Sequence, residues 1–293
     1  MLSLMTVRRV LLAAVLCLLL GIAAIAAVGE VLSRPAAHVI GAAPPDMHAS
    51  SVRVPIAPTQ FVSGWLSRGQ AGAGAVLLLH GVRADRTQML GRARFLKAAG
   101  YSVLLIDLPA YGESSGDRIT FGAREAAGVA ATLAYLRRAC PGERLGVIGV
   151  SLGAAALVLA QPTPPPSAVV VESMYPTITE AVADRLAVRL GSVGSALAPL
   201  LLWQLPLRVG VSPEHLRPIA VMATLGAPVL MASGTKDQHT LWSETERLFT
   251  AAAHPKELWA VEGAAHVDLH AYNAVGYESR ILRFFSKYLR NEA

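Results

Sequence analysis

Cysteine is scarce in this sequence. Cys17 and Cys140 are the only two cysteines among the 293 residues, and Cys17 lies inside an apolar N-terminal run. Two such positions exclude an intramolecular disulfide framework and are too few for a thiolate metal site. The metal-binding motif His-Glu-x-x-His does not occur either. We therefore expect no metal ion.

Charged residues are also few. They make up 16% of the chain, whereas hydrophobic residues make up 53%, a composition that favours a large folded core over disorder. The formal charge of +6 is scattered, with no run of lysine and arginine and no interleaved aromatic residues. Nucleic-acid binding is therefore not expected. The length fits one large α/β domain better than two small ones.

A long apolar run is present at the N-terminus. Arg8 and Arg9 precede residues 10–28, which contain no charge. This length matches a bilayer span and exceeds the usual core of a cleaved signal, although Ala24-Ile25-Ala26 fits a cleavage site. We interpret residues 1–29 as a signal-anchor, with a cleaved signal peptide as the alternative. In both cases the remainder of the chain is expected outside the cytoplasm, anchored to the membrane or released to the periplasm or medium.

The rest of the chain divides into a linker and a folded domain. Residues 30–51 are rich in alanine, proline and glycine and are predicted to be a linker. Within residues 52–293 a hairpin is expected first, followed by apolar runs that alternate with helical patterns. This alternation predicts a mostly parallel, eight-stranded sheet with helices on both faces. The expected strands are residues 52–56, 60–66, 75–79, 101–106, 145–150, 168–172, 228–232 and 256–261.

A serine lies between one of these strands and a helix. The segment Gly149-Val150-Ser151-Leu152-Gly153 precedes a run of good helix formers. A serine at such a turn has a strained backbone, and the flanking glycines remove side chains that would clash. Its hydroxyl would lie at a helix N-terminus, where backbone N–H groups favour a developing negative charge. Ser151 is therefore predicted to be a nucleophile, with an ordinary N-cap serine as the alternative.

A serine nucleophile needs a base, and the base needs an acid that orients it. In open α/β sheets such groups gather at the carboxyl ends of the strands. Asp237 follows the strand expected at residues 228–232, and His266 follows the one at residues 256–261. The chain order serine, aspartate, histidine is the one expected of this architecture. We predict a catalytic triad of Ser151, Asp237 and His266.

The other acids and histidines are given different roles. Glu262 is the second candidate acid, but it lies so close in sequence to His266 that a loop carboxylate is expected. Asp107 is expected to shape the turn that follows its strand, and His80 to fix the loop behind the site. The remaining candidates are expected at the surface: His239, His254 and His270.

An oxyanion hole should complete the site. The backbone N–H of Leu152 is one expected donor, because it follows the nucleophile directly. The second is the N–H of Val82, in the loop after the strand that ends at His80. Backbone donors leave little trace in side-chain identity, so this prediction depends on position alone.

With these motifs in order, the chain resembles the α/β-hydrolase family, over about residues 52–290. Within the family it is similar to small serine hydrolases related to monoglyceride lipases, acyl-protein thioesterases and dienelactone-hydrolase-like proteins, although Pro109-Ala110 stands where relatives often carry Arg-Gly. The resemblance implies an α/β-hydrolase fold and hydrolysis of an ester, thioester or amide without a cofactor. The motifs are His80-Gly81, Asp107, Tyr111-Gly112-Glu113-Ser114-Ser115-Gly116, the Ser151 turn, Gly234-Thr235-Lys236-Asp237 and Gly263-Ala264-Ala265-His266.

The resemblance leaves the reaction open. The preferred function is a serine esterase, lipase or thioesterase that cleaves a small apolar acyl ester or thioester through an acyl-enzyme. A membrane-tethered acyltransferase and a serine peptidase or amidase would use the same triad. A non-catalytic binding protein would keep only the fold, and the presence of all three triad residues argues against it.

An apolar insertion is expected over the site, at about residues 174–217. It follows the strand that ends at Glu172, where α/β-hydrolases insert lids, and its helix is expected to break at Gly191 and Gly194. A long stretch after this break carries no charge. Such residues can simply roof the core. The more specific prediction is that four of them line an acyl pocket: Leu200, Leu201, Trp203 and Leu205.

Overall fold

The computed structural model describes residues 4–290. The parts of the predicted segments 1–29 and 52–293 that fall on residues 1–3 and 291–293 lie outside the described residues. The strands are β1 (Ala36–Ala37), β2 (Ser50–Ala57), β3 (Gln60–Ser67), β4 (Ala75–Leu79), β5 (Ser102–Ile106), β6 (Tyr111–Gly112), β7 (Leu145–Val150), β8 (Ala168–Glu172), β9 (Val229–Gly234) and β10 (Lys256–Val261).

The α-helices alternate with the central strands. They are α1 (Leu4–Ser33), α2 (Leu90–Ala98), α3 (Ala123–Ala139), α4 (Leu152–Ala160), α5 (Ile178–Leu202), α6 (Leu205–Val209), α7 (Pro218–Val221), α8 (Trp242–Ala251), α9 (Leu269–Tyr272) and α10 (Ala274–Leu289). Short 3₁₀ helices lie at Pro45–Met47, Arg86–Met89, Pro213–His215 and Met222–Thr224.

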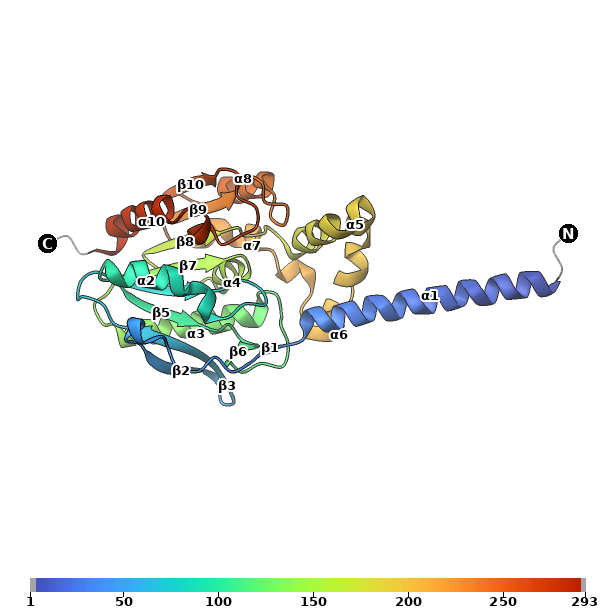
Figure 1. Cartoon of the computed structure of the whole chain (residues 1–293), viewed down its shortest axis with the longest axis horizontal. Coiled ribbons are helices and arrows are strands. Elements are labelled where there is room, and N and C mark those ends of the chain that lie inside the picture. Colours follow the sequence, from blue (N-terminus) through green and yellow to red (C-terminus); the bar gives the residue numbers. More distant parts are fainter. Residues whose placement is uncertain (1–3, 291–293) are drawn as a thin grey trace.

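Eight strands form one sheet in the order β10-β9-β8-β7-β4-β5-β3-β2. The pairs from β10 to β5 are parallel, whereas β3 is antiparallel to both β5 and β2. The predicted α/β-hydrolase fold with an eight-stranded, mostly parallel sheet is confirmed. Because the central strands are parallel, the turns after β4, β7, β9 and β10 meet at one edge of the sheet (Figure 1).

The central strands are buried on both faces, which explains their continuous apolar sequences. Alternate residues of β4 point to opposite sides: Leu77 and Leu79 pack with α3, α4 and α8, whereas Val76 and Leu78 pack with α2, α9 and α10. Two layers of helices therefore enclose the sheet and hold its strand ends rigidly in place.

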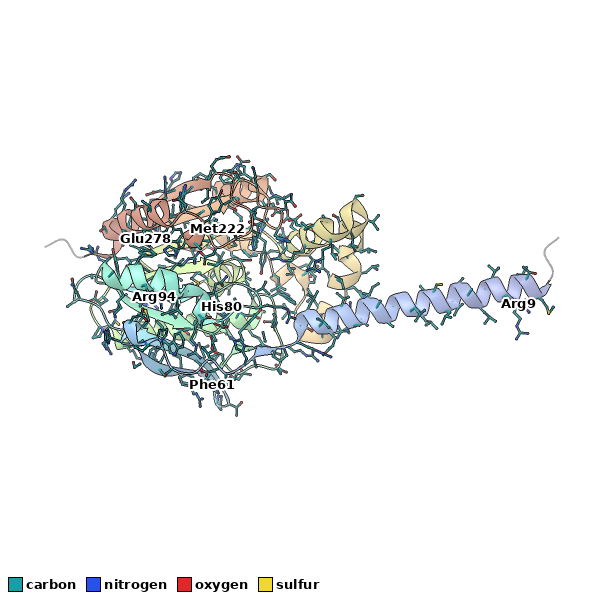
Figure 2. All side chains as sticks on the ribbon, viewed as in Figure 1. Arg9, Phe61, His80, Arg94, Met222 and Glu278 are labelled. Carbon is teal, nitrogen blue, oxygen red and sulfur yellow. The ribbon has the colours of Figure 1, made fainter. Side chains whose placement is uncertain are left out.

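Helix α1 extends away from the folded domain (Figure 1). Its residues 5–24 are exposed, and the side chains around Arg9 project from the helix with no other helix or strand of the described residues beside them (Figure 2). The helix is long and apolar enough to cross a membrane over Met5–Ser33, with a mean hydropathy of 3.0. The last turns of α1 contact α5 and α6.

Residues 34–49 belong to the segment predicted to be a linker, and they lie against the domain. The strand β1 pairs in parallel with β6. The backbone N–H groups of Ile40 and Gly41 donate to Glu113 at 3.0 and 2.9 Å, and Met47 is buried. The alanine- and proline-rich composition does not reveal this docking, because most of the contacts are made by backbone groups.

The region predicted as a lid lies between β8 and β9. It contains α5 and α6, and α5 bends at Gly191, whose φ of 63° and ψ of −153° are not helical. α5 also passes the length and hydropathy criteria for a membrane span, with a mean hydropathy of 1.3. α5 also contacts the last turns of α1.

Candidate active site

Ser151 occupies a strained turn between β7 and α4. Its φ of 49° and ψ of −107° are unfavourable for a residue with a side chain, and its residue surface is 2% exposed. The turn is fixed by its backbone, since Ser151 N–H donates to the carbonyl of Glu172 at 2.8 Å. The Oγ atom has no hydrogen-bond partner among the described residues. A buried, unpartnered hydroxyl held in a strained turn is available for chemistry.

The glycines around this turn allow close packing. A Cβ atom on Gly153 would lie 2.6 Å from the carbonyl oxygen of Leu79, and one on Gly149 would lie 2.7 Å from Ala154 Cα. Both neighbours are backbone atoms, which cannot move aside without distorting β4 or α4. The Gly-x-Ser-x-Gly pattern therefore has a steric cause here.

Asp237 and His266 come together at the ends of β9 and β10. The Nδ1 atom of His266 lies 2.7 Å from Asp237 Oδ2. The same oxygen accepts the Thr240 hydroxyl at 2.8 Å, and Oδ1 accepts the backbone N–H groups of His239 and Thr240 at 2.8 and 3.0 Å. Each carboxylate oxygen of Asp237 thus accepts two hydrogen bonds, which hold the side chain in one orientation.

These contacts keep Asp237 ionised. Burial by itself would raise the pKa of this carboxyl, but the hydrogen bond and the charge of His266, together with the two backbone donors, lower the pKa below its ordinary value. An ionised aspartate on Nδ1 requires the proton of a neutral imidazole to lie on that nitrogen. Nε2 of His266 is then left as the basic atom.

His239 corrects one expectation. It was expected at the surface, but its ring packs edge-on against His266, with 5.3 Å between the ring centroids, and its Nδ1 is buried. Burial, followed by the charges of Arg185 and His266, lowers the pKa of His239. The sequence places His239 two residues after Asp237, and the tight turn closed by the carboxylate brings it inward. His254, by contrast, is exposed as expected.

The loop after β4 is supported by His80. The buried Nε2 of His80 accepts the backbone N–H of Leu108 at 2.9 Å, and Nδ1 lies 2.7 Å from the carbonyl of Gly81. Burial lowers the pKa of His80 to about 4, so the ring is neutral. A neutral ring with Nδ1–H as donor satisfies both contacts, and it ties the loop that carries Val82 to the end of β5.

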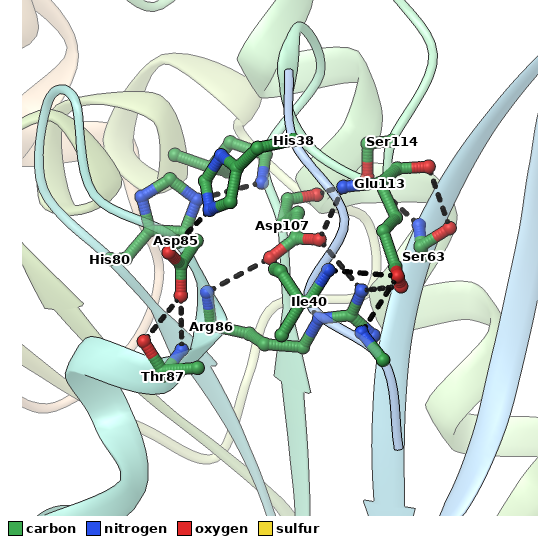
Figure 3. Close-up of polar contacts among 12 residues, drawn as sticks. His38, Ile40, Ser63, His80, Asp85, Arg86, Thr87, Asp107, Glu113 and Ser114 are labelled. Carbon is green, nitrogen blue, oxygen red and sulfur yellow. Dashed lines mark hydrogen bonds and ion pairs between the residues drawn. The ribbon is translucent and has the colours of Figure 1, made fainter. Parts of the chain in front are cut away.

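A cluster of charges fixes the next part of this edge (Figure 3). Asp107 Oδ1 accepts the backbone N–H of Arg86 at 2.9 Å, and Oδ2 accepts the backbone N–H of Glu113 at 2.9 Å. The buried Arg86 guanidinium pairs with both Asp107 and Glu113. Asp107 therefore holds the turn after β5, as expected, and has no free oxygen for a catalytic role.

A cavity of about 250 Å³ opens beside Ser151. Most of its walls come from the lid, the loops that precede α2 and α3, and the Ser151 turn, but three residues belong to the N-terminal helix. The lining residues are Gly29, Leu32, Ser33, Val82, Arg83, Phe121, Ser151, Leu152, Tyr175, Ile178, Ala181, Val182, Arg185, Leu201, Leu202, Gln204, Leu205 and Arg208.

The predicted pocket residues have different positions relative to this cavity. Val82 and Leu152 line it, and the N–H of Leu152 lies in the first turn of α4, where helices have no internal acceptor. Leu201 and Leu205 also line it. Leu200 and Trp203 are not among the lining residues and are 47% and 72% exposed. Neighbouring residues of a helix point about 100° apart, so only some of the apolar stretch can face inward.

Glu262 is the second candidate for the acid. Glu262 is exposed, and its contact with another side chain is made by its backbone carbonyl, which accepts the hydroxyl of Tyr272 at 3.2 Å. Within residues 4–290 no group of three or more histidine, cysteine, aspartate or glutamate side chains is placed to hold a metal ion.

Comparisons with known proteins agree with the fold. A family model described as "Alpha/beta hydrolase family" matches residues 76–277. An uncharacterized protein of Mycobacterium tuberculosis, Rv2307c, is 32% identical over 209 residues, which cover 71% of this chain and 68% of the relative. The uncharacterized protein YqkD of Bacillus subtilis is 23% identical over 242 residues, covering 81% and 79% of the two chains.

Solved structures share the architecture at low sequence identity. The Pyrococcus furiosus esterase Pf2001 superposes with a TM-score of 0.73 at 21% identity, covering 88% of this chain and 98% of the esterase. An esterase from Exiguobacterium antarcticum, EaEST, gives a TM-score of 0.60 at 13% identity, with coverage of 81% and 100%. At these identities the likeness concerns the fold.

Proposed function

Because the chain belongs to the alpha/beta hydrolase family, we propose that it is a serine hydrolase that cleaves esters or thioesters of apolar acyl groups. The observation that carries this proposal is the hydrogen-bonded His266–Asp237 pair at the same sheet edge as the strained, unpartnered Ser151. Ser151 is the proposed nucleophile, His266 the base and Asp237 the acid that orients it.

The proposed reaction follows from these roles. His266 Nε2 removes the proton of Ser151 Oγ as that oxygen attacks the acyl carbonyl carbon. The N–H groups of Leu152 and Val82 stabilise the resulting oxyanion. The oxyanion collapses, the bond to the alcohol or thiol breaks, and His266 returns the proton to that leaving group. Water, deprotonated by His266, then attacks the acyl carbon. The bond between that carbon and Ser151 Oγ breaks, the acid leaves, and His266 returns the proton to Ser151 Oγ.

The walls of the cavity support an apolar acyl group. Leu152, Leu201 and Leu205 line the same cavity as Ser151, and each substrate methylene buried there contributes about 0.8 kcal/mol. Hydrolysis and acyl transfer share the acyl-enzyme and differ only in whether water or an alcohol attacks it. Analysis of the products with added alcohol distinguishes the two.

The proposal extends to location. We infer that α1 anchors the protein in a membrane, with Arg8 and Arg9 on the cytoplasmic side and the folded domain outside the cytoplasm. The orientation is inferred from the distribution of positive charge, because the flank that precedes the span carries the paired arginines.

Labelling with an ethyl fluorophosphonate, followed by hydrolysis of acyl esters of graded length, tests this function. The wild type should be labelled once, and Ser151→Ala should lose both labelling and ester hydrolysis while it keeps its melting temperature. His266→Ala should lose several orders of magnitude in rate. A Ser151→Ala protein that is labelled as fully as the wild type would refute the assignment of the nucleophile.

A further inference from the structure

The last turns of α1 present one face to the lid. Residues 5–24 are exposed, whereas residues 25, 26, 29 and 30 are half-buried and Ser33 is buried. These positions recur at intervals of three to four residues, which is the spacing of one helix face. The apolar helix therefore has two parts, a free part and a part that belongs to the folded domain.

Polar groups of the lid fasten this face. Gln204 Nε2 donates to the carbonyl of Ile25 at 3.0 Å, and Arg208 donates to the carbonyl of Ala26. Arg208 also pairs with Glu30 at 2.8 Å. Gly29 lies at the closest approach, because a Cβ atom there would be 2.5 Å from Gln204 Oε1. These bonds hold residues on both sides of the possible cleavage site after Ala26.

The fastened turns also form part of the wall of the candidate active site. Gly29, Leu32 and Ser33 line the same cavity as Ser151, together with lid residues such as Leu201 and Leu205. The N-terminal helix is thus positioned to touch whatever group occupies the cavity, in addition to any role in tethering.

The length of the free part places this cavity relative to a bilayer. Counted from Arg9, the uncharged and exposed residues 10–24 span about 22 Å at 1.5 Å per residue, which is less than the roughly 30 Å of the hydrocarbon core. The lid then lies at the membrane surface, and its exposed apolar side chains include Leu197, Leu200, Trp203 and Leu207. Tryptophan is typical of that interfacial layer.

We propose that α1 is retained as part of the acyl-binding site, and that the substrate is an acyl lipid taken up from the bilayer alongside α1. The inference rests on the proposed serine hydrolase function. It assigns Leu32 to the wall that contacts the acyl chain, together with the lid leucines. The apolar cavity beside the end of a membrane-length helix gives such a chain a continuous apolar path.

The test compares two neighbouring positions of α1 in the full-length protein, reconstituted in phosphatidylcholine vesicles. Leu32→Trp adds volume at a residue that lines the cavity, whereas Val31→Trp is the matched control, because the two residues are similarly exposed (40% and 53%) and Val31 does not line the cavity. The readout is the ratio of kcat/KM for 4-methylumbelliferyl dodecanoate to that for the acetate. Each excluded methylene costs a factor of about four, so exclusion of two lowers the ratio about 15-fold in Leu32→Trp. Val31→Trp should keep the wild-type ratio.

A second pair of variants controls for the case in which the added tryptophan disturbs folding. Leu32→Ala removes wall contacts without adding volume and should lower the same ratio several-fold, whereas Val31→Ala should not. Mass spectrometry of the membrane-extracted protein should find residues 1–26 still attached. Equal ratios in the Leu32 and Val31 variants, or cleavage after Ala26, would overturn the inference. If the wild type were not labelled by the ethyl fluorophosphonate, that result would instead overturn the proposed function.

Discussion

Replacing Asp237 by asparagine tests the orientation of the base. Asp237 Oδ1 accepts two backbone N–H groups, so the amide oxygen of asparagine must take that place. The amide nitrogen then faces His266 Nδ1, which is 2.7 Å from Oδ2 in the wild type. An N–H donor at this position stabilises the tautomer that carries its proton on Nε2. That nitrogen can then no longer accept the proton of Ser151.

The size of the effect follows from this reversal. The same substitution in another Ser-His-Asp triad costs about 10⁴-fold in kcat, which corresponds to about 5 kcal/mol of activation free energy. All four hydrogen bonds of the side chain can still form, two of them with reversed direction, because the amide can donate both to His266 Nδ1 and to the Thr240 hydroxyl. The variant should therefore fold, with a melting temperature close to that of the wild type.

The assay is the steady-state hydrolysis of p-nitrophenyl butyrate, with Glu262→Gln as the matched carboxylate-to-amide control. Glu262 is exposed and should tolerate the change. A loss of less than about tenfold in Asp237→Asn, or a larger loss in Glu262→Gln, would refute the assignment of the acid.

Three further predictions concern stability. Gly153→Ala should lower the melting temperature and activity together, since the new Cβ meets the Leu79 carbonyl at 2.6 Å; an unchanged melting curve would contradict the steric argument. The buried guanidinium of Arg92 forms an ion pair with the buried carboxylate of Glu172. Arg92→Met leaves that carboxylate without its partner and should lower the free energy of unfolding in urea by about 3–5 kcal/mol; a loss below 1 kcal/mol would count against this reasoning. Burial and the nearby charge of Asp184 raise the pKa of Glu244 to about 8. The folded state then holds a proton that the unfolded chain releases above about pH 4.5, so stability falls from there to about pH 8 and stays low. The melting temperature of Glu244→Gln should fall less over this pH range. An equal fall in the wild type and the variant between pH 5 and pH 9 would contradict the prediction.

The sheet was readily predicted from the sequence for a physical reason. Strands buried on both faces need apolar residues at every position, so segments such as residues 75–79 and 168–172 are recognisable without context. Ser151 was recognisable because steric crowding around its turn demands glycine at two fixed positions. Asp237 and His266 followed from strand order, since their loops share an edge of the sheet.

Other features depend on contacts that leave no local pattern. The position of His239 against His266 is decided by a two-residue turn around a carboxylate. The contribution of Leu32 to the cavity depends on packing between elements about 170 residues apart, and an apolar membrane-length helix has the same composition whether or not its end is docked. In the lid, the uncharged sequence indicates only that some leucines face inward. Which leucines do so depends in part on the bend at Gly191.

The docking of residues 34–49 has a mechanical consequence. The chain between α1 and the sheet has no slack, because β1 is paired and the N–H groups of Ile40 and Gly41 are bound to Glu113, which Arg86 holds in turn (Figure 3). A domain mounted this rigidly cannot swing out into solution on a tether. With α1 anchored in a bilayer, as proposed, the domain would encounter partners by lateral diffusion in two dimensions. Its rate should therefore follow the surface density of substrate in the membrane, so that dilution with inert lipid slows turnover even when the total substrate is unchanged.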